Sequence, residues 1–390
     1  MVKGLFCHYL PIYKDINGIY CSTTLTDEFF SRYFCVADEL YVATRVYPIN
    51  KTYQEAHQEK ISLSNVHIIE FPNLSTPLNI LTKLAGSKKK MLKAAEAADL
   101  IFIRGGIIAL LGVDAANKLH KPYLRECAGC AWDEYWNYSF LGKLMAPYME
   151  YRAKKITKEA SHVIYVTEKW LQNRYPTNGE FTYASNVMLN TIDEKALTDR
   201  IEKLKSFSTK KTVRLGTTGG IGNKAKGQQY VMKAMSALSD LYDFQYELVG
   251  GGDASYLTDT AKKFGVSDKV IFKGQLTHEE ILNWLDSIDI YIQPSVQEGL
   301  PRALIEAMSR ACPAIGSTTG GIPELLMDEN VFKRGSAKDL VRVIKNTLTQ
   351  DLTENAKINF NKSKEYSIGL LNERRNVLYC KYLEFVRGNK

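Results

Sequence analysis

Residues 294–324 read PSVQEGLPRALIEAMSRACPAIGSTTGGIPE, and the fold is decided by this stretch. An apolar run from Ile288 to Ile292 precedes it and predicts a short buried strand. Pro301 then opens a helical pattern that ends near Met308, because proline suits the first helical turn, where its missing N–H is not needed. A second apolar run, from Cys312 to Gly316, predicts the next strand. The stretch therefore predicts one repeating unit of an α/β domain.

Two glutamates, Glu298 and Glu306, lie on either side of the predicted helix start. Glu306 falls about one and a half turns into the helix, roughly 7 Å along its axis. The start of a helix has free backbone N–H groups and a positive dipole end, which together favour an anion such as a diphosphate. A carboxylate on each side suits a nucleotide-sugar, whose sugar and ribose hydroxyls flank its diphosphate. The spacing alone fits two solvated surface glutamates about equally well.

The motif EGLPRALIEAM, followed by the strand and by GGIPE, resembles the nucleotide-sugar half of GT-B glycosyltransferases. The resemblance is specifically to the retaining family 4, the glycosyl transferases group 1, whose hallmark is two glutamates separated by seven residues. It implies that Glu298 contacts the donor sugar and that Glu306 contacts the ribose. It also implies that the backbone at Gly299 and Leu300, together with Arg302, meets the charge of the diphosphate.

Composition and charge narrow the class of protein. A chain of 390 residues suggests two or three domains, and 45% hydrophobic with 24% charged residues is typical of a soluble globular protein. Seven scattered cysteines fit a reducing cytosol, and no run reaches the ~18 apolar residues that a membrane span needs. The net charge of +8 is not concentrated in one domain, which argues against nucleic acid as a partner. We expect a cytoplasmic enzyme.

The first half, residues 1–188, alternates apolar runs with helical patterns, which predicts a doubly wound parallel sheet. The predicted strands are Gly4 to Leu10, Glu39 to Thr44, Val66 to Glu70, Leu100 to Ile103, Tyr123 to Arg125 and His162 to Val166. Gly18 precedes a predicted helix from Ile19 to Phe30. The resemblance implies a glycine-rich loop near the donor phosphates here, with a plain turn glycine as the alternative.

The loop after the fifth predicted strand reads RECAGCAWDEYWNYSF. The resemblance implies that this region lines the acceptor side and carries a histidine that meets the donor sugar. The loop contains no histidine, and His120 and His162 lie outside it. Glu126 is the polar residue closest to the expected position and is our candidate for a catalytic role there. The CxxC pair in this loop lacks a second pair or nearby histidines, so we expect buried thiols and no metal.

Two basic clusters suggest a further partner. Five lysines fall between Lys83 and Lys93, next to apolar residues such as Leu81 and Met91. Such a segment can rest on anionic lipid, with each cation contributing about 1 kcal/mol near the surface. A second cluster spans Arg152 to Lys158. The sequence therefore predicts peripheral contact with the inner face of the plasma membrane, and solvated helix ends are the alternative.

The second half begins after a polar linker, residues 189–210, and forms a second unit at 211–366. Its first turn, RLGTTGGIGNKAKGQQY, resembles the diphosphate loop of the family, where Lys226 reaches the phosphates. The family usually carries an arginine six residues earlier, at the position of Gly220. The turn at Gly274 is where such enzymes hold the base. An NAD-binding alternative lacks the downstream Tyr-x-x-x-Lys pair of short-chain dehydrogenases. The pattern at about 367–390 resembles the GT-B tail helix that crosses back to the first domain.

The resemblance implies a retaining glycosyltransferase that moves a sugar from a UDP- or GDP-sugar to a hydroxyl group. The acceptor is a glycan or a polyprenyl-diphosphate-linked molecule in bacterial capsule, O-antigen or exopolysaccharide synthesis. Glu298, Lys226 and Glu126 are the expected catalytic residues. No Asp-x-Asp motif is present, so we expect no metal or other cofactor. A GT-B sugar-nucleotide epimerase and a non-catalytic nucleotide-sugar binder are the alternatives.

Overall fold

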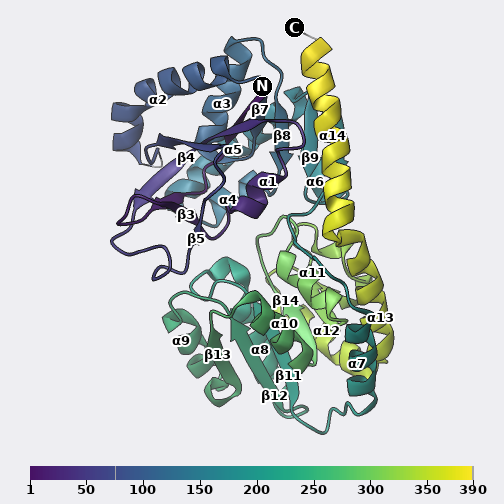
Figure 1. Cartoon of the computed structure of the whole chain (residues 1–390). Helices are drawn as coiled ribbons and strands as arrows, with labels where there is room; N and C mark the ends of the chain where they lie inside the picture. Colours follow the sequence, from purple (N-terminus) through teal and green to yellow (C-terminus); the bar gives the residue numbers. More distant parts are fainter. Residues whose placement is uncertain (75, 389–390) are drawn as a thin grey trace.

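The computed structural model describes residues 1–74 and 76–388, which form two α/β domains beside each other in Figure 1. The sheet of the first domain has ten strands. Parallel pairings join the strands in the order β10, β9, β8, β7, β1, β4 and β6, and the end of β4 also pairs in parallel with β2. Their bounds are β1 Lys3–Cys7, β4 Glu39–Pro48, β6 Val66–Phe71, β7 Leu100–Ile103, β8 Leu124–Cys127, β9 His162–Tyr165 and β10 Glu180–Tyr183.

At one edge of this sheet the structure differs from the sequence prediction. The helix predicted from Ile19 to Phe30 is wrong: β2 (Ile12–Lys14) and β3 (Tyr20–Ser22) form an antiparallel hairpin there, and β3 pairs with β5 (Glu59–Lys60). The Asp15 carboxylate accepts hydrogen bonds from the N–H groups of Asn17 and Ile19, at 2.9 and 2.8 Å, and fixes the turn. Gly18 takes the left-handed conformation in this turn, with φ of 79°. Only the short α1 (Asp27–Ser31) follows.

The remaining helices of the first domain connect its parallel strands. They are α2 (Pro77–Ala97), α3 (Gly106–Lys118), α4 (Ala131–Trp136), α5 (Phe140–Glu159) and α6 (Trp170–Arg174). None of the helices in the described residues is both long enough and apolar enough to cross a bilayer.

The second domain has six parallel strands in the order β13, β12, β11, β14, β15 and β16. Their bounds are β11 Val213–Thr218, β12 Phe244–Val249, β13 Val270–Gly274, β14 Ile290–Gln293, β15 Ala314–Ser317 and β16 Val331–Phe332. The helices are α8 (Gln228–Ala237), α9 (Ser255–Lys263), α10 (His278–Ser287), α11 (Arg302–Ser309), α12 (Ala337–Thr349) and α13 (Leu352–Ser363). The predicted strand–helix–strand unit at residues 288–316 is therefore confirmed, with shifts of one or two residues.

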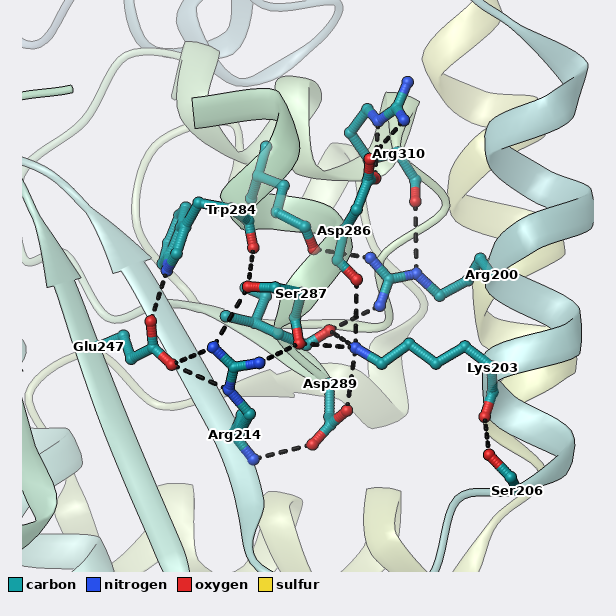
Figure 2. A network of polar contacts seen from close by, with 12 residues as sticks. Arg200, Lys203, Ser206, Arg214, Glu247, Trp284, Asp286, Ser287, Asp289 and Arg310 are labelled. Carbon is teal, nitrogen blue, oxygen red and sulfur yellow. Dashed lines mark hydrogen bonds and ion pairs between the residues drawn. The ribbon is translucent and has the colours of Figure 1, made fainter. Parts of the chain in front are cut away.

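The segment predicted as a linker contains α7 (Glu194–Lys205), which is bonded to the second domain (Figure 2). The Arg200 guanidinium donates to the carbonyl groups of Leu285 and Ile288, at 2.7 and 2.6 Å. Lys203 donates to the Ser287 carbonyl at 2.7 Å and forms an ion pair with Asp289 at 3.1 Å. The helix is thereby anchored at the end of α10.

The last described helix, α14 (Ile368–Gly388), runs from the second domain along the first (Figure 1). Its Tyr382 hydroxyl donates to the Pro122 carbonyl at 3.0 Å and accepts from the Ile101 N–H at 3.1 Å. Its Tyr379 hydroxyl donates to Glu126 at 2.9 Å. These bonds confirm the predicted return of the C-terminal helix to the first domain.

Candidate active site

A cavity of about 320 Å³ lies between the two domains, at the carboxyl ends of their central strands. This is where doubly wound sheets bind ligands. The first domain contributes residues that follow β1 and β7, the end of β8 and the start of α4. The second domain contributes the loops after β11 and β14. The polar and glycine residues on the walls include His8, Tyr9, Arg104, Gly105, Arg125, Glu134, Asn223, Lys226, Gln297, Glu298 and Gly299.

Lys226 and Glu298 form an ion pair on the second-domain wall, with Lys226 Nζ 2.7 Å from Glu298 Oε1. The same oxygen accepts from the Ser295 hydroxyl at 2.8 Å, so the carboxylate is held in one orientation. Lys226 ends a 3₁₀ turn, Lys224–Lys226, and its stem lies over Gly219, where a Cβ would be 3.3 Å from Lys226 Cδ. The two catalytic candidates of this domain thus meet at the cavity.

Two helices begin at this pair without a side-chain cap. Neither α8 nor α11 has a side-chain hydrogen bond to its first N–H groups. The loops that lead into them touch, because the Val296 N–H donates to the Ala225 carbonyl at 2.8 Å. Gly227 starts α8 with φ of 77°, and a Cβ there would lie 2.0 Å from the Pro294 carbonyl oxygen. Free N–H groups and two positive dipole ends therefore converge beside Lys226.

Glu306 lies in α11, four residues after the exposed Arg302. Burial raises the pKa of the Glu306 carboxyl, and the positive charge of Arg302 opposes that change. Its carboxylate accepts no hydrogen bond from residues 1–74 and 76–388, which are those that the structure describes. This carboxylate is therefore available to accept hydroxyl donors from a ligand.

Gly299 and Leu300 occupy the point at which the domains touch. A Cβ on Gly299 would lie 2.2 Å from the carbonyl oxygen of Ala128, in the first domain. The Leu300 side chain is buried and packs close to Gly321. Only a glycine allows the helix start of α11 to approach the first domain this closely.

The other glycine candidates differ in position. Gly220 lies in the loop after β11 with open space beside it, since a Cβ would meet only Asn223 Cβ at 3.8 Å. Gly274 ends β13 with φ of 73° and accepts from the Gly250 N–H at 2.9 Å. Gly18 lies in the hairpin turn described above and does not line the cavity. Lys224, in the same loop as Gly220, places its ammonium group 4.2 Å from the centre of the Tyr256 ring.

Glu126 lies behind the cavity wall and does not line it. Its carboxylate pairs with Arg104 at 2.8 Å and accepts from the Tyr33 hydroxyl at 2.6 Å and from Tyr379. Burial would raise the pKa of Glu126, but Arg104 and the hydroxyl donors outweigh it and hold the pKa below its usual value. This buried network joins β8 to α14, so the position of Glu126 fits a structural role and not the expected catalytic one.

The loop after β8 contains no histidine, although the resemblance implied one there. The histidine that lines the cavity is His8, which follows β1. Burial and the positive charges of Arg104 and Arg125 hold the pKa of His8 well below its usual value, so the ring is neutral. Tyr9 donates its hydroxyl proton to Glu134 across the cavity wall. These residues were missed, although Arg104 directly follows a predicted strand, which is a usable signal. His8 fell inside the predicted strand from Gly4 to Leu10, whereas β1 ends at Cys7.

Polar contacts between the domains flank the cavity. Arg334 of the second domain forms two hydrogen bonds with the Asp133 carboxylate of α4, at 3.0 and 3.2 Å. The Glu324 carboxylate, also of the second domain, accepts from the N–H groups of Glu168 and Lys169, at 2.7 and 3.1 Å, just before α6. The two walls of the cavity are thereby held against each other.

Comparisons with known proteins agree with this architecture. A family profile described as "Glycosyl transferases group 1" matches residues 199–364. Protein CapJ of Staphylococcus aureus is 32% identical over 352 residues, which cover 87% of this chain and 84% of CapJ. The amylovoran biosynthesis glycosyltransferase AmsK of Erwinia amylovora is 39% identical over 90 residues, which cover 21% of this chain and 22% of AmsK. HepE of Anabaena, solved in complex with UDP and glucose, superposes with a TM-score of 0.63 at 17% identity, covering 96% of this chain and 98% of HepE.

The fold and the cleft therefore define a glycosyltransferase of the GT-B architecture, and the protein is an enzyme of the transferase class. The chain belongs to the glycosyl transferases group 1 family.

Proposed function

We propose that the enzyme is a retaining transferase that moves a sugar from a UDP- or GDP-sugar to an acceptor hydroxyl. The observation that carries the proposal is the Lys226–Glu298 pair between two helix starts that lack side-chain caps. A diphosphate at this point would receive backbone N–H groups and the Lys226 ammonium group. The hydroxyls of the donor sugar and of the ribose would then bond to Glu298 and Glu306. The complex of HepE with UDP supports a uridine nucleotide as the first donor to test.

Transfer would break the bond between the sugar anomeric carbon and the phosphate oxygen. Negative charge then develops on the departing diphosphate, where Lys226 and the starts of α8 and α11 would stabilise it. We propose that the acceptor hydroxyl attacks from the face of the leaving group and that its proton passes to the departing phosphate oxygen. This order of events retains the anomeric configuration. Because these groups meet the developing charge, we propose that the reaction needs no metal ion.

A thermal-shift screen tests the donor site. UDP, GDP, ADP and their common sugar conjugates would be compared with and without EDTA, on the wild type and on Glu306→Ala. A ligand at about 100 times its Kd stabilises the folded state by about 2.7 kcal/mol, which gives a clear change in Tm. We expect one nucleotide class to raise the Tm, EDTA to have no effect and Glu306→Ala to reduce the shift. Glu279→Ala, an exposed glutamate of α10, is the control. A wild type that no nucleotide stabilises would refute the proposal.

The acceptor is proposed to be a glycan or a polyprenyl-diphosphate-linked glycan of a bacterial surface polysaccharide. The name of AmsK places that relative in the synthesis of amylovoran. The acceptor would enter the cavity along the first-domain wall and present its hydroxyl next to Glu298. A radioactive transfer assay with purified lipid-linked oligosaccharides, read by extraction into butanol, tests this part of the proposal. If the labelled sugar stays in the aqueous phase with every lipid acceptor, this part of the proposal is wrong.

We further propose that the first domain rests on an anionic membrane, with α5 in place of α2 as the contact. In α2, Met91 is buried and Leu84 and Leu92 pack against the core, so its exposed large apolar groups are Leu78 and Leu81, near its start. One face of α5 packs inward, while its other face exposes large apolar groups. These are Phe140 (77% exposed), Leu141 (64%), Leu144 (65%), Tyr148 (48%) and Tyr151 (62%). Lys143, Lys154 and Lys155 supply positive charge beside this face.

Flotation with vesicles of phosphatidylglycerol shows whether α5 or α2 is the membrane contact. Leu141→Ser with Leu144→Ser should weaken binding about tenfold, because each removes exposed apolar area from the bilayer. Changing Lys88, Lys89 and Lys90 to glutamine should have the smaller effect. If the lysine changes weaken vesicle binding more than the leucine changes do, α2 is the contact. If the wild type does not float with the vesicles, the proposal of membrane contact is wrong.

A further inference from the structure

The first-domain wall of the cavity holds a buried cation that forms no ion pair in the described residues. Arg125 is 7% exposed, and its guanidinium donates only to the backbone carbonyls of Ile103 and Arg104. It forms no ion pair with any residue that the structure describes, and its Nε is buried without a hydrogen-bond partner. A buried charge of this kind is costly unless a group of opposite charge comes to it.

Most of the neighbouring charges do not supply that group, because they are already paired. Arg104 is paired with Glu126, and Lys226 with Glu298, so each of these pairs is neutral in itself. Arg45 adds a further positive charge, since its guanidinium lies 5.5 Å from the centre of the Tyr9 ring. Glu134 is the one carboxyl group of the first domain that lines the cavity in the described residues. Burial raises the pKa of Glu134, although the positive charge of Arg125 opposes this. The Glu134 carboxyl also accepts a hydrogen bond from the Tyr9 hydroxyl.

Two further features of the same wall are suited to an anion. The helix α3 begins at Gly105 and Gly106, which line the cavity, and no side chain caps its first N–H groups. His8 is 4% exposed, and neither ring nitrogen has a hydrogen-bond partner of good geometry in the described chain. A neutral imidazole can donate one N–H to a ligand. The start of α3, Arg125 and His8 therefore all line the same wall of the cavity.

We propose that this wall is a subsite for an anionic group, a phosphate or a carboxylate, carried by the acceptor. This inference rests on the proposed function, because it takes the opposite wall with Lys226 as the donor site. An acceptor held by its anion at Arg125 would be fixed while its hydroxyl reaches the donor sugar near Glu298. Two acceptor chemistries provide such an anion: the phosphate of a lipid-linked diphosphate and the carboxylate of an acidic sugar.

Calorimetric titration with inorganic pyrophosphate and with glucuronate tests the subsite. We expect Arg125→Gln to weaken binding of one of these probes at least tenfold, and Arg125→Lys to retain most of it. Lys226→Ala should leave a binding site for that probe, since it disables only the donor wall. Arg342→Gln, a cation on the surface of the second domain, is the control. Binding of pyrophosphate alone would assign the phosphate source, and binding of glucuronate alone the acidic sugar.

Nucleotide binding is measured on the same variants, so that this inference and the donor proposal can fail separately. Nucleoside diphosphate should stabilise Arg125→Gln as much as the wild type. If Arg125→Gln loses the nucleotide shift, the subsite belongs to the donor and the inference is overturned. Equal binding of both probes to wild type and Arg125→Gln, or no binding at all, overturns it as well. If Arg125→Gln does not fold, His8→Phe is tested in its place. We expect His8→Phe to weaken binding of the probe at least threefold. Unchanged binding of the probe to His8→Phe overturns the inference.

Discussion

Gly220 leaves an open place beside the diphosphate loop, where enzymes that this sequence resembles carry an arginine. A Cβ there meets only Asn223 Cβ at 3.8 Å, and the backbone is not in the left-handed region. We expect Gly220→Arg to tighten the binding of a nucleoside diphosphate about tenfold, because one charge-assisted hydrogen bond contributes about 1.5–3 kcal/mol. Calorimetry measures the change.

Gly219→Ala is the matched control for this substitution. Its Cβ would press on the stem of Lys226, at 3.3 Å from Cδ, so we expect weaker binding. If Gly220→Arg binds nucleotide no better than the wild type, the diphosphate does not lie beside this loop.

Glu306 makes the stability of the free enzyme depend on pH. Its pKa is raised by burial in the folded state, so the folded protein binds a proton more tightly than the unfolded chain does. The wild type is therefore stabilised as the pH falls from neutral through the raised pKa towards the usual value of 4.5. Glu306→Gln is always neutral and should have the higher Tm at pH 7, with the difference disappearing near pH 4.5. A Tm difference that is the same at both pH values would contradict this prediction.

Single residues also show what the sequence could reveal about the site. Glu298, Glu306 and Lys226 were predicted from their spacing to a helix start, which is a local property, and from the resemblance; Glu298 and Lys226 line the cavity, and Glu306 does not. His8 and Arg125 are 117 residues apart in the chain and become neighbours only when β1, β7 and β8 pair. Glu126 was misplaced because adjacent residues of a strand point to opposite faces, and its neighbour Arg125 faces the cavity.

Among the elements, α7 has anchors that can be tested. Arg200 is buried and its guanidinium bonds to carbonyl groups at the end of α10 (Figure 2). We expect Arg200→Ala to lower the free energy of unfolding by roughly 2–4 kcal/mol, because buried carbonyls lose their donors. Chemical denaturation monitored by circular dichroism measures the change.

Lys195 of the same helix is the control, since it is 72% exposed and pairs only with Asp199. Lys195→Ala should lower the free energy of unfolding by less than about 0.5 kcal/mol. Equal effects of the two substitutions would mean that α7 is not anchored through Arg200.

The elements that the sequence predicted best are those with continuous apolar runs. The strand Leu100–Ile103 was predicted without error, because all four residues are buried and no other element competes for such a run. The second strand of the hairpin, Tyr20–Ser22, was read as the start of a helix, since the register of the hairpin depends on the Asp15 carboxylate and on pairing with β4 and β5. Likewise, Met91 of α2, which suggested lipid contact, is buried in the core, whereas Leu81 is exposed.

At the scale of the whole molecule, the Arg334–Asp133 pair connects the domains. Asp133 is 8% exposed and Arg334 is 36% exposed, so solvent screens the pair only in part. We expect a double-mutant cycle with Arg334→Ala and Asp133→Ala to give a coupling energy of about 1 kcal/mol. The Tm values of the four proteins provide the measurement. Additive effects would show that the pair does not hold the domains together.

The return of α14 to the first domain has a consequence for synthesis of the protein on the ribosome. Tyr379 packs against Tyr33 and Phe102, at 5.7 and 5.5 Å between ring centres, in the core of the domain that is translated first. Domains usually fold in the order in which they are made. Here the first domain must wait with an open core until α14 has been translated, while the second domain completes its sheet earlier. A message that stops before codon 379 would therefore yield an intact second domain joined to a first domain whose core remains exposed to chaperones and proteases.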